Sequence, residues 1–232
     1  IRMLQTELAP LLSQLHLNAS AQTLKKLEQY WERVKQAPIN LTAIKTDADA
    51  ALLHFADSLA PLAFNFIADH AKLIDVGTGG GFPAVPLAVM RDDISVTAMD
   101  ATRKKIDFIR ENAPVSNLTC IQARAEEAGH GPLRETFDIA CARAVAPLNL
   151  VAEYLAPFVK IGGIAIAYKA DLTQEELESG IRAAKMLGLS MRTPISFSLN
   201  GIQTISRTLV VFDKKQATPP RFPRTGAHKK PL

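Results

Sequence analysis

The segment that most constrains the fold is residues 73–82, with the sequence LIDVGTGGGF, in which an apolar run passes through Asp75 into glycines at 77, 79 and 81. Such a run predicts a buried strand followed by a tight turn. Glycine has no Cβ and reaches positive φ at low cost, so a ligand can approach the backbone of such a turn closely. The segment therefore predicts a strand-to-helix turn that holds a nucleotide-like ligand.

From residue 72 onward the hydrophobic pattern alternates between strands and helices. We expect strands near 72–76, 94–99, 117–121, 136–142 and 161–169, and helices near 83–91, 102–112, 147–158 and 173–187. This alternation predicts an α/β fold with a mostly parallel, doubly wound sheet and helices on both faces.

Residues 3–68 have a different pattern, because their apolar residues recur at spacings of three and four, which is typical of amphipathic helices. Ser20 or Asn18 is suited to cap the second of these helices. The expected organisation is a helical extension at 1–68 packed on the core, a sheet domain at 69–213 and a tail at 214–232.

The last strands of the sheet domain distinguish between families of α/β proteins. Residues 192–199 and 202–212 are strand-like, and Asn200-Gly201 between them is the preferred pair for a two-residue type I′ hairpin turn. A parallel sheet that ends in an antiparallel hairpin differs from the pattern of dinucleotide dehydrogenases. It matches the seven-stranded sheet of S-adenosylmethionine-dependent methyltransferases, in which the last strand lies antiparallel beside the fifth.

The details of the glycine turn argue against a phosphate ligand. A P-loop ends in Gly-Lys-Ser/Thr, whereas Phe82-Pro83 follows Gly81 here. A dinucleotide fingerprint that starts at Gly77 requires glycine or alanine at position 82. S-adenosylmethionine has no phosphate and needs only a close approach to the backbone, for which Asp75, Gly77, Gly79, Gly81 and Phe82 are suited.

Further candidate residues follow at the ends of the next strands. Asp100 ends the second strand and is placed either to accept hydrogen bonds from both ribose hydroxyls or to cap the helix that begins near Thr102. Ala125 and Glu126 follow the third strand, where the methyltransferase fold holds the adenine.

Two cations follow the fourth and fifth strands. Arg143 stands where many amino-group and cytosine methyltransferases carry Asn/Asp-Pro-Pro-Tyr/Phe or Pro-Cys, and neither motif is present. An arginine there indicates an anionic substrate whose nucleophile needs no deprotonation, or else a surface ion pair. Lys169 ends the fifth strand at the same edge of the sheet. His54 and His70 lack the spacing of metal ligands, so we expect no metal site and assign both to helix-surface or satisfied core positions.

Composition and charge bound the remaining possibilities. Cys120 and Cys141 are the only cysteines, and no long apolar run or signal sequence is evident, so we expect a soluble cytoplasmic protein without a membrane partner. The formal charge is +4, but six of the 27 basic residues and only one of the 23 acids lie from residue 213 onward. With four prolines, the tail at 214–232 reads as an extended arm that either binds a polyanion such as RNA or is a merely solubilising end.

With these features together, the chain resembles the bacterial guanine-N7 methyltransferases of small-subunit ribosomal RNA, also called the glucose-inhibited division protein B family. The similarity covers nearly the whole chain. The matching stretches are Trp31 with Asn40-Leu-Thr-Ala-Ile44, His54 with Asp57-Ser58-Leu59, the run from Asp75 to Leu87, Asp100 with Arg103-Lys104, Arg124-Ala-Glu126, Arg143-Ala144, Tyr168-Lys169, and the ending from Arg221-Phe-Pro-Arg224 to Lys229-Lys-Pro-Leu232.

The resemblance implies that S-adenosylmethionine contacts Gly77, Phe82, Ala125, Glu126 and Arg143, and that the substrate is a guanine in the decoding-region loop of 16S ribosomal RNA, within the small subunit or its precursor. Guanine N7 has a free lone pair, so transfer needs alignment rather than a general base, with Arg143 and Lys169 positioning the reactants. We expect a monomer. The cations assigned to RNA are Arg103, Lys104, Arg124, Arg207, Arg221, Arg224, Lys229 and Lys230.

Two alternatives remain open from the sequence. A methyltransferase-like protein that only binds RNA during ribosome assembly would keep the fold without the cofactor. A nicotinamide-dependent oxidoreductase would share the glycine turn and Asp100 but needs a hydride-transfer residue, for which the sequence offers no candidate.

Overall fold

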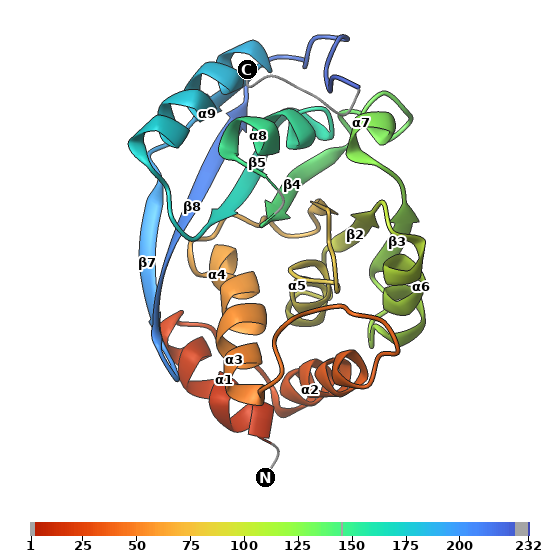
Figure 1. Ribbon diagram of the computed structural model, residues 1–232, viewed down its shortest axis with the longest axis vertical. Coiled ribbons are helices and arrows are strands. Elements are labelled where there is room, and N and C mark those ends of the chain that lie inside the picture. Colours follow the sequence, from red (N-terminus) through yellow and green to blue (C-terminus); the bar gives the residue numbers. More distant parts are fainter. Residues whose placement is uncertain (1–2, 145, 226–231) are drawn as a thin grey trace.

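The computed structural model describes residues 3–144, 146–225 and 232. Its centre is an eight-stranded sheet in the order β3-β2-β1-β4-β5-β8-β6, with β7 also paired to β8 (Figure 1). β1 to β5 pair in parallel, and β8 is antiparallel to β5. The strands are β1 (Lys72–Val76), β2 (Ser95–Asp100), β3 (Leu118–Gln122), β4 (Phe137–Arg143), β5 (Val159–Lys169), β6 (Leu189–Met191), β7 (Ile195–Asn200) and β8 (Thr204–Lys214).

Helices cover both faces of the sheet, as the alternating pattern predicted. One face packs against α1 (Met3–Gln14), α2 (Ala21–Lys35), the continuous helix formed by α3 (Asp47–Ala50), η1 (Ala51–Ala56) and α4 (Asp57–Ala63), and also α5 (Ala84–Met90) and α6 (Arg103–Asn112). The other face packs against α8 (Leu148–Leu155) and α9 (Gln174–Met186), with the short α7 (Ala125–Ala128) beside them (Figure 1). None of the described helices is long and apolar enough to cross a membrane.

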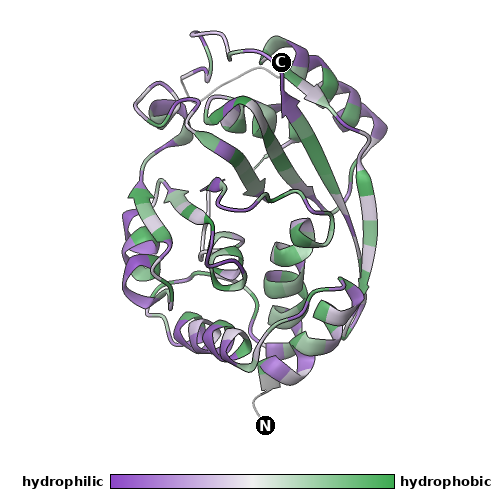
Figure 2. Ribbon diagram, turned by 180° about the vertical axis from the view of Figure 1, so that it is seen from behind, coloured by the Kyte–Doolittle hydropathy of each residue, from purple (hydrophilic) through white to green (hydrophobic). Residues whose placement is uncertain are grey.

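The two faces divide the strand residues between two apolar cores. In β1, Leu73 packs into the core on the side of the N-terminal helices, and Ile74 packs into the core below α8 and α9. In β4, Ile139 and Ala140 divide in the same way. Side chains alternate between the faces of a strand, and a parallel sheet buries both faces, so central strands are largely apolar. Figure 2 shows the central strands mostly green, with purple at a few positions.

The N-terminal helices belong to the same core as the sheet. Leu4, Leu8 and Leu11 of α1 and Trp31 of α2 are buried in one cluster with residues of β1, β2 and β4. The Ser20 side chain accepts a hydrogen bond from Thr23 N at 3.1 Å, which confirms Ser20 as the cap of α2. These helices therefore form one wall of the sheet domain.

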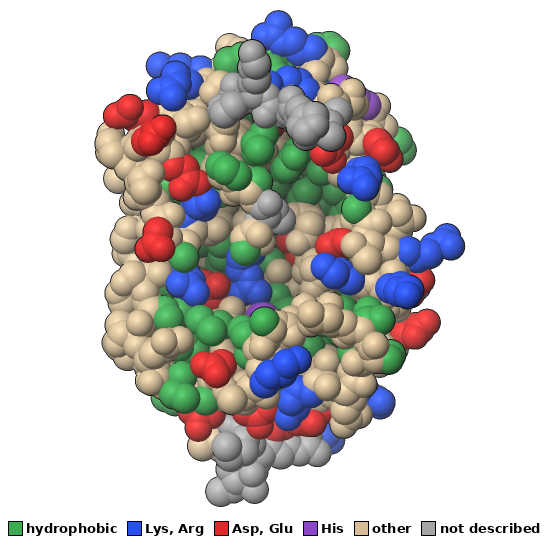
Figure 3. Space-filling model, in the orientation of Figure 1, with side chains coloured by type: hydrophobic (Ala, Val, Ile, Leu, Met, Phe, Trp, Pro, Cys, Tyr) green, Lys and Arg blue, Asp and Glu red, His purple; other side chains and the backbone are tan. Residues whose placement is uncertain are grey.

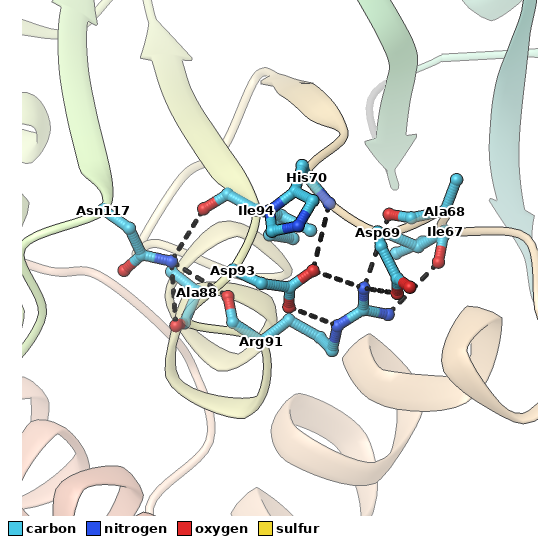
Figure 4. Close-up of polar contacts among 9 residues, drawn as sticks. All are labelled: Ile67, Ala68, Asp69, His70, Ala88, Arg91, Asp93, Ile94 and Asn117. Atoms are coloured by element: carbon cyan, nitrogen blue, oxygen red, sulfur yellow. Dashed lines mark hydrogen bonds and ion pairs between the residues drawn. The ribbon is translucent and has the colours of Figure 1, made fainter.

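Polar contacts tie together the loops at the amino edge of the sheet, opposite the carboxyl ends of the strands (Figure 4). Arg91 donates to both carboxylate oxygens of Asp93, at 2.6 and 2.7 Å, and to Asp69 at 3.0 Å. The Arg91 hydrogen bond is the main cause that lowers the pKa of Asp93 far below its usual range. Asn117 donates to the carbonyls of Ala88, Arg91 and Ile94. The Asn117 side chain thus supplies hydrogen bonds to three buried or half-buried carbonyls inside the protein. We therefore assign this edge of the sheet to stabilising the fold.

The C-terminal hairpin differs from the predicted turn. Asn200 pairs with Thr204, so the loop is the three residues 201–203, and neither Asn200 nor Gly201 has positive φ. The predicted type I′ turn at Asn200-Gly201 is therefore wrong. Gln14 of α1 holds Asn200 in the strand, because its side chain bonds both the N–H and the C=O of Asn200, each at 2.9 Å.

The strand expected at residues 192–199 is present as β7, and β6 is an additional strand before it that the sequence did not predict. β6 pairs with the last residues of β8 and β7 with its first residues, and the break between them contains Pro194. Proline has no N–H to donate to a ladder, so it interrupts an edge strand. The antiparallel ending of a methyltransferase sheet is thus present, with its edge strand in two pieces.

The tail also differs from the expected arm. Its first residue, Lys214, ends β8 and is buried, where it donates to Ala156 O at 2.6 Å and pairs with Glu135 at 3.1 Å. Phe222 is buried, and Arg224 forms an ion pair with the fully buried Glu153 at 2.7 Å. Residues 214–224 therefore pack onto the sheet domain, because their apolar and charged side chains find buried partners there. Lys229 and Lys230 lie outside the described residues.

Candidate active site

The carboxyl ends of the parallel strands bring most of the predicted site residues to one edge of the sheet. β1 pairs with both β2 and β4, with Asp75 opposite Ala98 and opposite Cys141. Gly77 follows β1, Asp100 ends β2 and Arg143 ends β4, so these three lie on neighbouring strands. Ligands of open α/β sheets bind at this edge. Figure 3 shows this face, where Lys and Arg side chains lie along a hollowed central band.

The glycine turn uses its glycines for different reasons. Gly77, Gly79 and Gly81 have φ of 79°, 58° and 86°, a region that side chains rarely adopt. A Cβ on Gly81 would collide with the Tyr30 hydroxyl of α2, whereas a Cβ on Gly79 would meet no atom within 4 Å. Tyr30 also donates to Gly80 O at 2.8 Å. Gly81 is thus needed for packing on α2, and Gly79 faces open space.

Asp75 lies beneath this turn and is completely buried. Its Oδ2 accepts a hydrogen bond from Ala84 N at 3.1 Å, while its Oδ1 and the nearby buried Thr78 Oγ1 have no hydrogen-bond partner among the described residues. Burial raises the pKa of Asp75 to about 6, against the opposing effects of the neighbouring Thr78 side chain, the hydrogen bond from Ala84 N and the Arg143 charge. Asp75 supports the turn from below, and its predicted contact with a cofactor stays a prediction.

A first hollow, which we call the β1–β2 hollow, opens above the ends of these two strands. It is lined by Val76, Gly77, Met99, Asp100, Ala101, Ala123, Arg124, Ala125, Glu126 and Tyr154. Its walls are largely apolar, with two carboxylates and one exposed arginine. The structure thus brings together four residues predicted for the cofactor: Gly77, Asp100, Ala125 and Glu126.

The structure decides neither of the two roles that the sequence left open for Asp100, because the N-cap of α6 is Thr102 and the contact with a ribose stays a prediction. Its Oδ1 accepts from Thr102 N at 2.8 Å, at the start of α6, and its Oδ2 accepts from Gly79 N at 3.0 Å. Each carboxylate oxygen has a second lone pair, so the side chain that lines the hollow retains acceptor capacity. Asp100 therefore fixes the glycine turn against α6 and presents a preorganised carboxylate to a ligand.

Arg143 does not line the β1–β2 hollow, because neighbouring residues hold its guanidinium. Nη1 donates to Leu53 O at 2.8 Å and to Asp57 Oδ2 at 3.1 Å. Leu53 belongs to the π-helical turn η1, where the i→i+5 pattern alters the usual carbonyl pairing, a feature common at functional sites. The predicted contact of Arg143 with the cofactor stays a prediction, and the structure shows Arg143 as a link between β4 and η1.

His54 and Phe82 pack beside Arg143. Their rings stack with centroids 4.3 Å apart, and the Arg143 guanidinium lies 5.9 Å from the Phe82 ring centre. His54 Nε2 lies 2.7 Å from Thr42 Oγ1, and its Nδ1 lies 3.4 Å from Arg143 Nη2. Burial, and then the Arg143 charge, lower the pKa of His54 to about 3, so the ring is neutral. His54 is therefore half-buried with both ring nitrogens engaged, which favours the satisfied core position among the two expected from the sequence, and the Phe82 side chain does not line the β1–β2 hollow.

A second hollow, the β4–β5 hollow, lies on the other side of Arg143. It is lined by Leu53, His54, Asp57, Arg143, Ala144, Tyr168, Lys169, Ala170, Asp171 and Arg207. Asp57 bridges two arginines, since its Oδ2 pairs with Arg143 and its Oδ1 with Arg207 Nε, both at 3.1 Å. Lys169 pairs with Glu176 at 2.6 Å. The structure thus brings Arg143, Lys169 and Arg207 together around one hollow.

The other cations predicted for RNA have different surroundings. Arg103, Lys104 and Arg124 are exposed at the starts of α6 and α7, and their side chains make no hydrogen bond or ion pair with the described residues. Arg221 is also exposed and lies over the Phe222 ring, 5.0 Å from its centre. Arg224 is committed to Glu153. Of these exposed cations, Arg124 lines the β1–β2 hollow, and Arg103 and Lys104 begin the helix that follows Asp100.

Three residues of the site were not predicted. Asp57 anchors two of the cations, Tyr30 holds the glycine turn, and Tyr154 lines the β1–β2 hollow. Burial and the neighbouring Glu126 raise the pKa of Tyr154. An acid within an otherwise apolar run, one helical turn after His54, was a usable signal for Asp57. Within the described part of the chain, no group of three or more His, Cys, Asp or Glu side chains is arranged to hold a metal ion.

Comparison of the sequence with known proteins identifies the family to which this chain belongs. The family model described as "rRNA small subunit methyltransferase G" matches residues 23–204. Proteins of that name are similar over most of the chain: that of Deinococcus radiodurans is 42% identical over 190 residues (80% of this chain and 75% of the relative). That of Leuconostoc mesenteroides is 38% identical over 232 residues (95% and 96%).

Solved structures show the same fold at low identity. A putative methyltransferase from Bacillus halodurans superimposes with a TM-score of 0.55 at 14% identity, over 69% of this chain and 100% of the other. M. jannaschii TYW2 in complex with AdoMet gives a TM-score of 0.51 at 18% identity, over 64% and 72%. These likenesses confirm the predicted methyltransferase fold.

Proposed function

Because this chain belongs to the family of rRNA small subunit methyltransferase G, we propose that it transfers the methyl group of S-adenosylmethionine to N7 of a guanine in the decoding-region loop of 16S ribosomal RNA. The observation that carries the proposal is the arrangement of the two hollows. The nucleoside-sized β1–β2 hollow and the cation-lined β4–β5 hollow lie on either side of Arg143 at one edge of the sheet.

The β1–β2 hollow fits S-adenosylmethionine by shape and charge. Asp100 presents a carboxylate to the ribose hydroxyls, and Ala123, Ala125 and Tyr154 offer apolar walls to the adenine. The lining carries two acids and one exposed arginine, which suits a cofactor with a sulfonium and an ammonium group better than a dinucleotide with two phosphates. The buried Asp75 Oδ1 beneath the turn, without a described partner, is an acceptor of suitable charge for the ammonium.

The side chains around the β4–β5 hollow agree with a reaction that needs no general base. Bound S-adenosylmethionine supplies an electrophilic methyl group, and guanine N7 has a lone pair without a proton. Asp57 is shared by two arginines, Lys169 pairs with Glu176, and His54 has both ring nitrogens engaged. None of these three is poised to abstract a proton, and the remaining acid of the lining, Asp171, is not required as a base because N7 carries no proton, so alignment of the two reactants is the contribution of the protein.

The cations of the β4–β5 hollow are assigned to the RNA backbone and to the edges of the base other than N7. An arginine that donated to N7 would occupy the lone pair that must react. Asp57 holds Arg143 and Arg207 at fixed positions beside the base. Arg103, Lys104 and Arg124 extend the cationic surface past the β1–β2 hollow. We place the reaction in the cytoplasm, on the small subunit or its precursor, with the protein acting as a monomer.

The test is to map N7-methylguanine in 16S ribosomal RNA from cells that lack the protein. One methylated guanine should disappear, and return when the wild-type gene is supplied but not when Asp100→Ala is supplied. Unchanged methylation would reject the proposal. Isothermal titration of the purified protein with S-adenosylmethionine and with NAD separates the alternatives. An assembly factor binds neither, and an oxidoreductase binds the second.

A further inference from the structure

One acid of the β4–β5 hollow has no partner among the residues that the structure describes. Asp171 lines the hollow and is exposed, and it makes no hydrogen bond or ion pair within the described part of the chain. The other acid that lines the hollow, Asp57, is occupied by two arginines. A free carboxylate in a hollow with three cations is unexpected if the hollow serves only to attract phosphate, because it reduces the positive potential there.

A free arginine donor borders the same hollow. Arg207 uses Nε for Asp57 and Nη1 for the carbonyl of Ser206, at 3.0 Å, and its Nη2 donates to none of the described residues. Lys169 of β5 pairs with Thr208 of β8, which brings Asp171 and Arg207 to the same rim of the hollow. Because Asp57 fixes the Arg207 guanidinium, the orientation of its free N–H groups is set before any ligand binds.

We propose that Asp171 and Arg207 read the Watson–Crick edge of the target guanine. This inference rests on the proposed function, which requires the opposite edge of the base to be free. Guanine N1–H and N2–H form a pair of donors that a carboxylate accepts with two parallel hydrogen bonds, and O6 accepts from an arginine. Enzymes that act on an unstacked base commonly read it on this edge.

The same two residues reject adenine. Adenine presents a lone pair at N1, which the Asp171 carboxylate repels, and an amino group at position 6, which opposes the Arg207 donors. A site that hydrogen-bonds one base discriminates against another because the wrong base leaves hydrogen-bonding groups of the site unpaired. Positive charge also develops on guanine during transfer to N7, so the Asp171 carboxylate is expected to stabilise the transition state more than the ground state.

The experiment couples a change in the protein to a change in the base. Methyl transfer is measured for wild type and Asp171→Asn on small subunits reconstituted with 16S ribosomal RNA that carries either guanine or inosine, which lacks the 2-amino group, at the target position. We expect Asp171→Asn to lower kcat/KM on guanine by about 10- to 100-fold, with kcat falling as well. Wild type should lose activity on inosine by a similar factor, whereas Asp171→Asn should barely distinguish the two bases.

The matched control is Asp92→Asn, which removes an exposed acid at the amino edge of the sheet and should leave both activities unchanged. Affinity for S-adenosylmethionine, measured by calorimetry, should be the same in all three proteins. Equal guanine-to-inosine ratios for wild type and Asp171→Asn would overturn the role of Asp171 while leaving the proposed function intact. A wild-type protein that methylates no guanine N7 would instead overturn the proposed function.

Discussion

The ion pair between Arg224 and Glu153 yields the sharpest prediction for stability. Glu153 is fully buried in α8, and its carboxylate receives Arg224 N at 2.7 Å, Nε at 3.0 Å and Nη2 at 2.7 Å. Arg224→Ala keeps the backbone donor but removes the guanidinium, so a buried carboxylate loses its countercharge. Breaking one side of a buried pair costs about 3 to 5 kcal/mol, and the lower end, about 3 kcal/mol, applies because Arg224 is 29% exposed.

For a domain of this size, that loss lowers the melting temperature by roughly 6 to 12 °C. Urea denaturation followed by circular dichroism measures the free energy of unfolding directly. Arg221→Ala is the control, because it removes only an exposed contact with Phe222 and should cost less than about 1 kcal/mol. The double variant Arg224→Ala with Glu153→Gln should recover part of the loss, since no unpaired charge remains. The reasoning fails if Arg224→Ala is as stable as Arg221→Ala.

The remaining predictions concern the glycine turn, two buried titratable groups and the RNA surface. Gly81→Ala should lower the free energy of unfolding by more than about 2 kcal/mol in urea titrations, because its Cβ meets Tyr30, whereas Gly79→Ala should mainly weaken S-adenosylmethionine binding in calorimetry. Equal stability of the two variants would contradict this. Burial raises the pKa of Asp75 to about 6, so the carboxyl contributes most to the free energy of unfolding below about pH 4 and this contribution is lost as pH rises through 6. The free energy of unfolding of the wild type should therefore fall by about 3 kcal/mol over this range, and Asp75→Asn should lack that fall. A wild-type stability curve with the same slope as Asp75→Asn over this range would argue against burial of the ionised carboxylate. Arg143→Gln should raise the pKa of His54 in NMR titrations, because the Arg143 charge helps to keep the ring neutral; an unchanged pKa would leave burial as its only cause. The double variant Arg103→Gln, Lys104→Gln should reduce the salt dependence of RNA binding by a slope of about 1.5, and an unchanged slope would remove α6 from the RNA surface.

The sequence predicted the framework of the fold well. The strands from β1 to β5 and the helices between them lie near the expected residues, because burial on both faces and helical periodicity leave strong local patterns. Ser20 capped α2 as expected, since capping depends on residues only three apart. Predictions that depended on one segment of chain and its immediate neighbours were therefore confirmed.

Predictions that depended on distant segments were weaker. The turn at Asn200 was wrong because Gln14, far away in the sequence, holds Asn200 in the strand. Residues 214–224 resembled a free basic arm, but Glu153 and Glu135 neutralise Arg224 and Lys214 inside the fold. A sequence shows which residues are charged, but it does not show which residue of opposite charge each of them contacts in the fold.

The sequence by itself determined the strand-to-helix turn at Gly77–Gly81, the Asp100 carboxylate beside it and the family to which the chain is similar. These features follow from residue types at short spacings, which restrict the backbone locally. Only the tertiary structure decided that Gly81 accommodates Tyr30, that Asp57 holds Arg143 and Arg207, and that Asp171 has no partner among the described residues. Pairing of side chains depends on which segments the sheet and its helices bring together, and that choice is made by the packing of the whole chain.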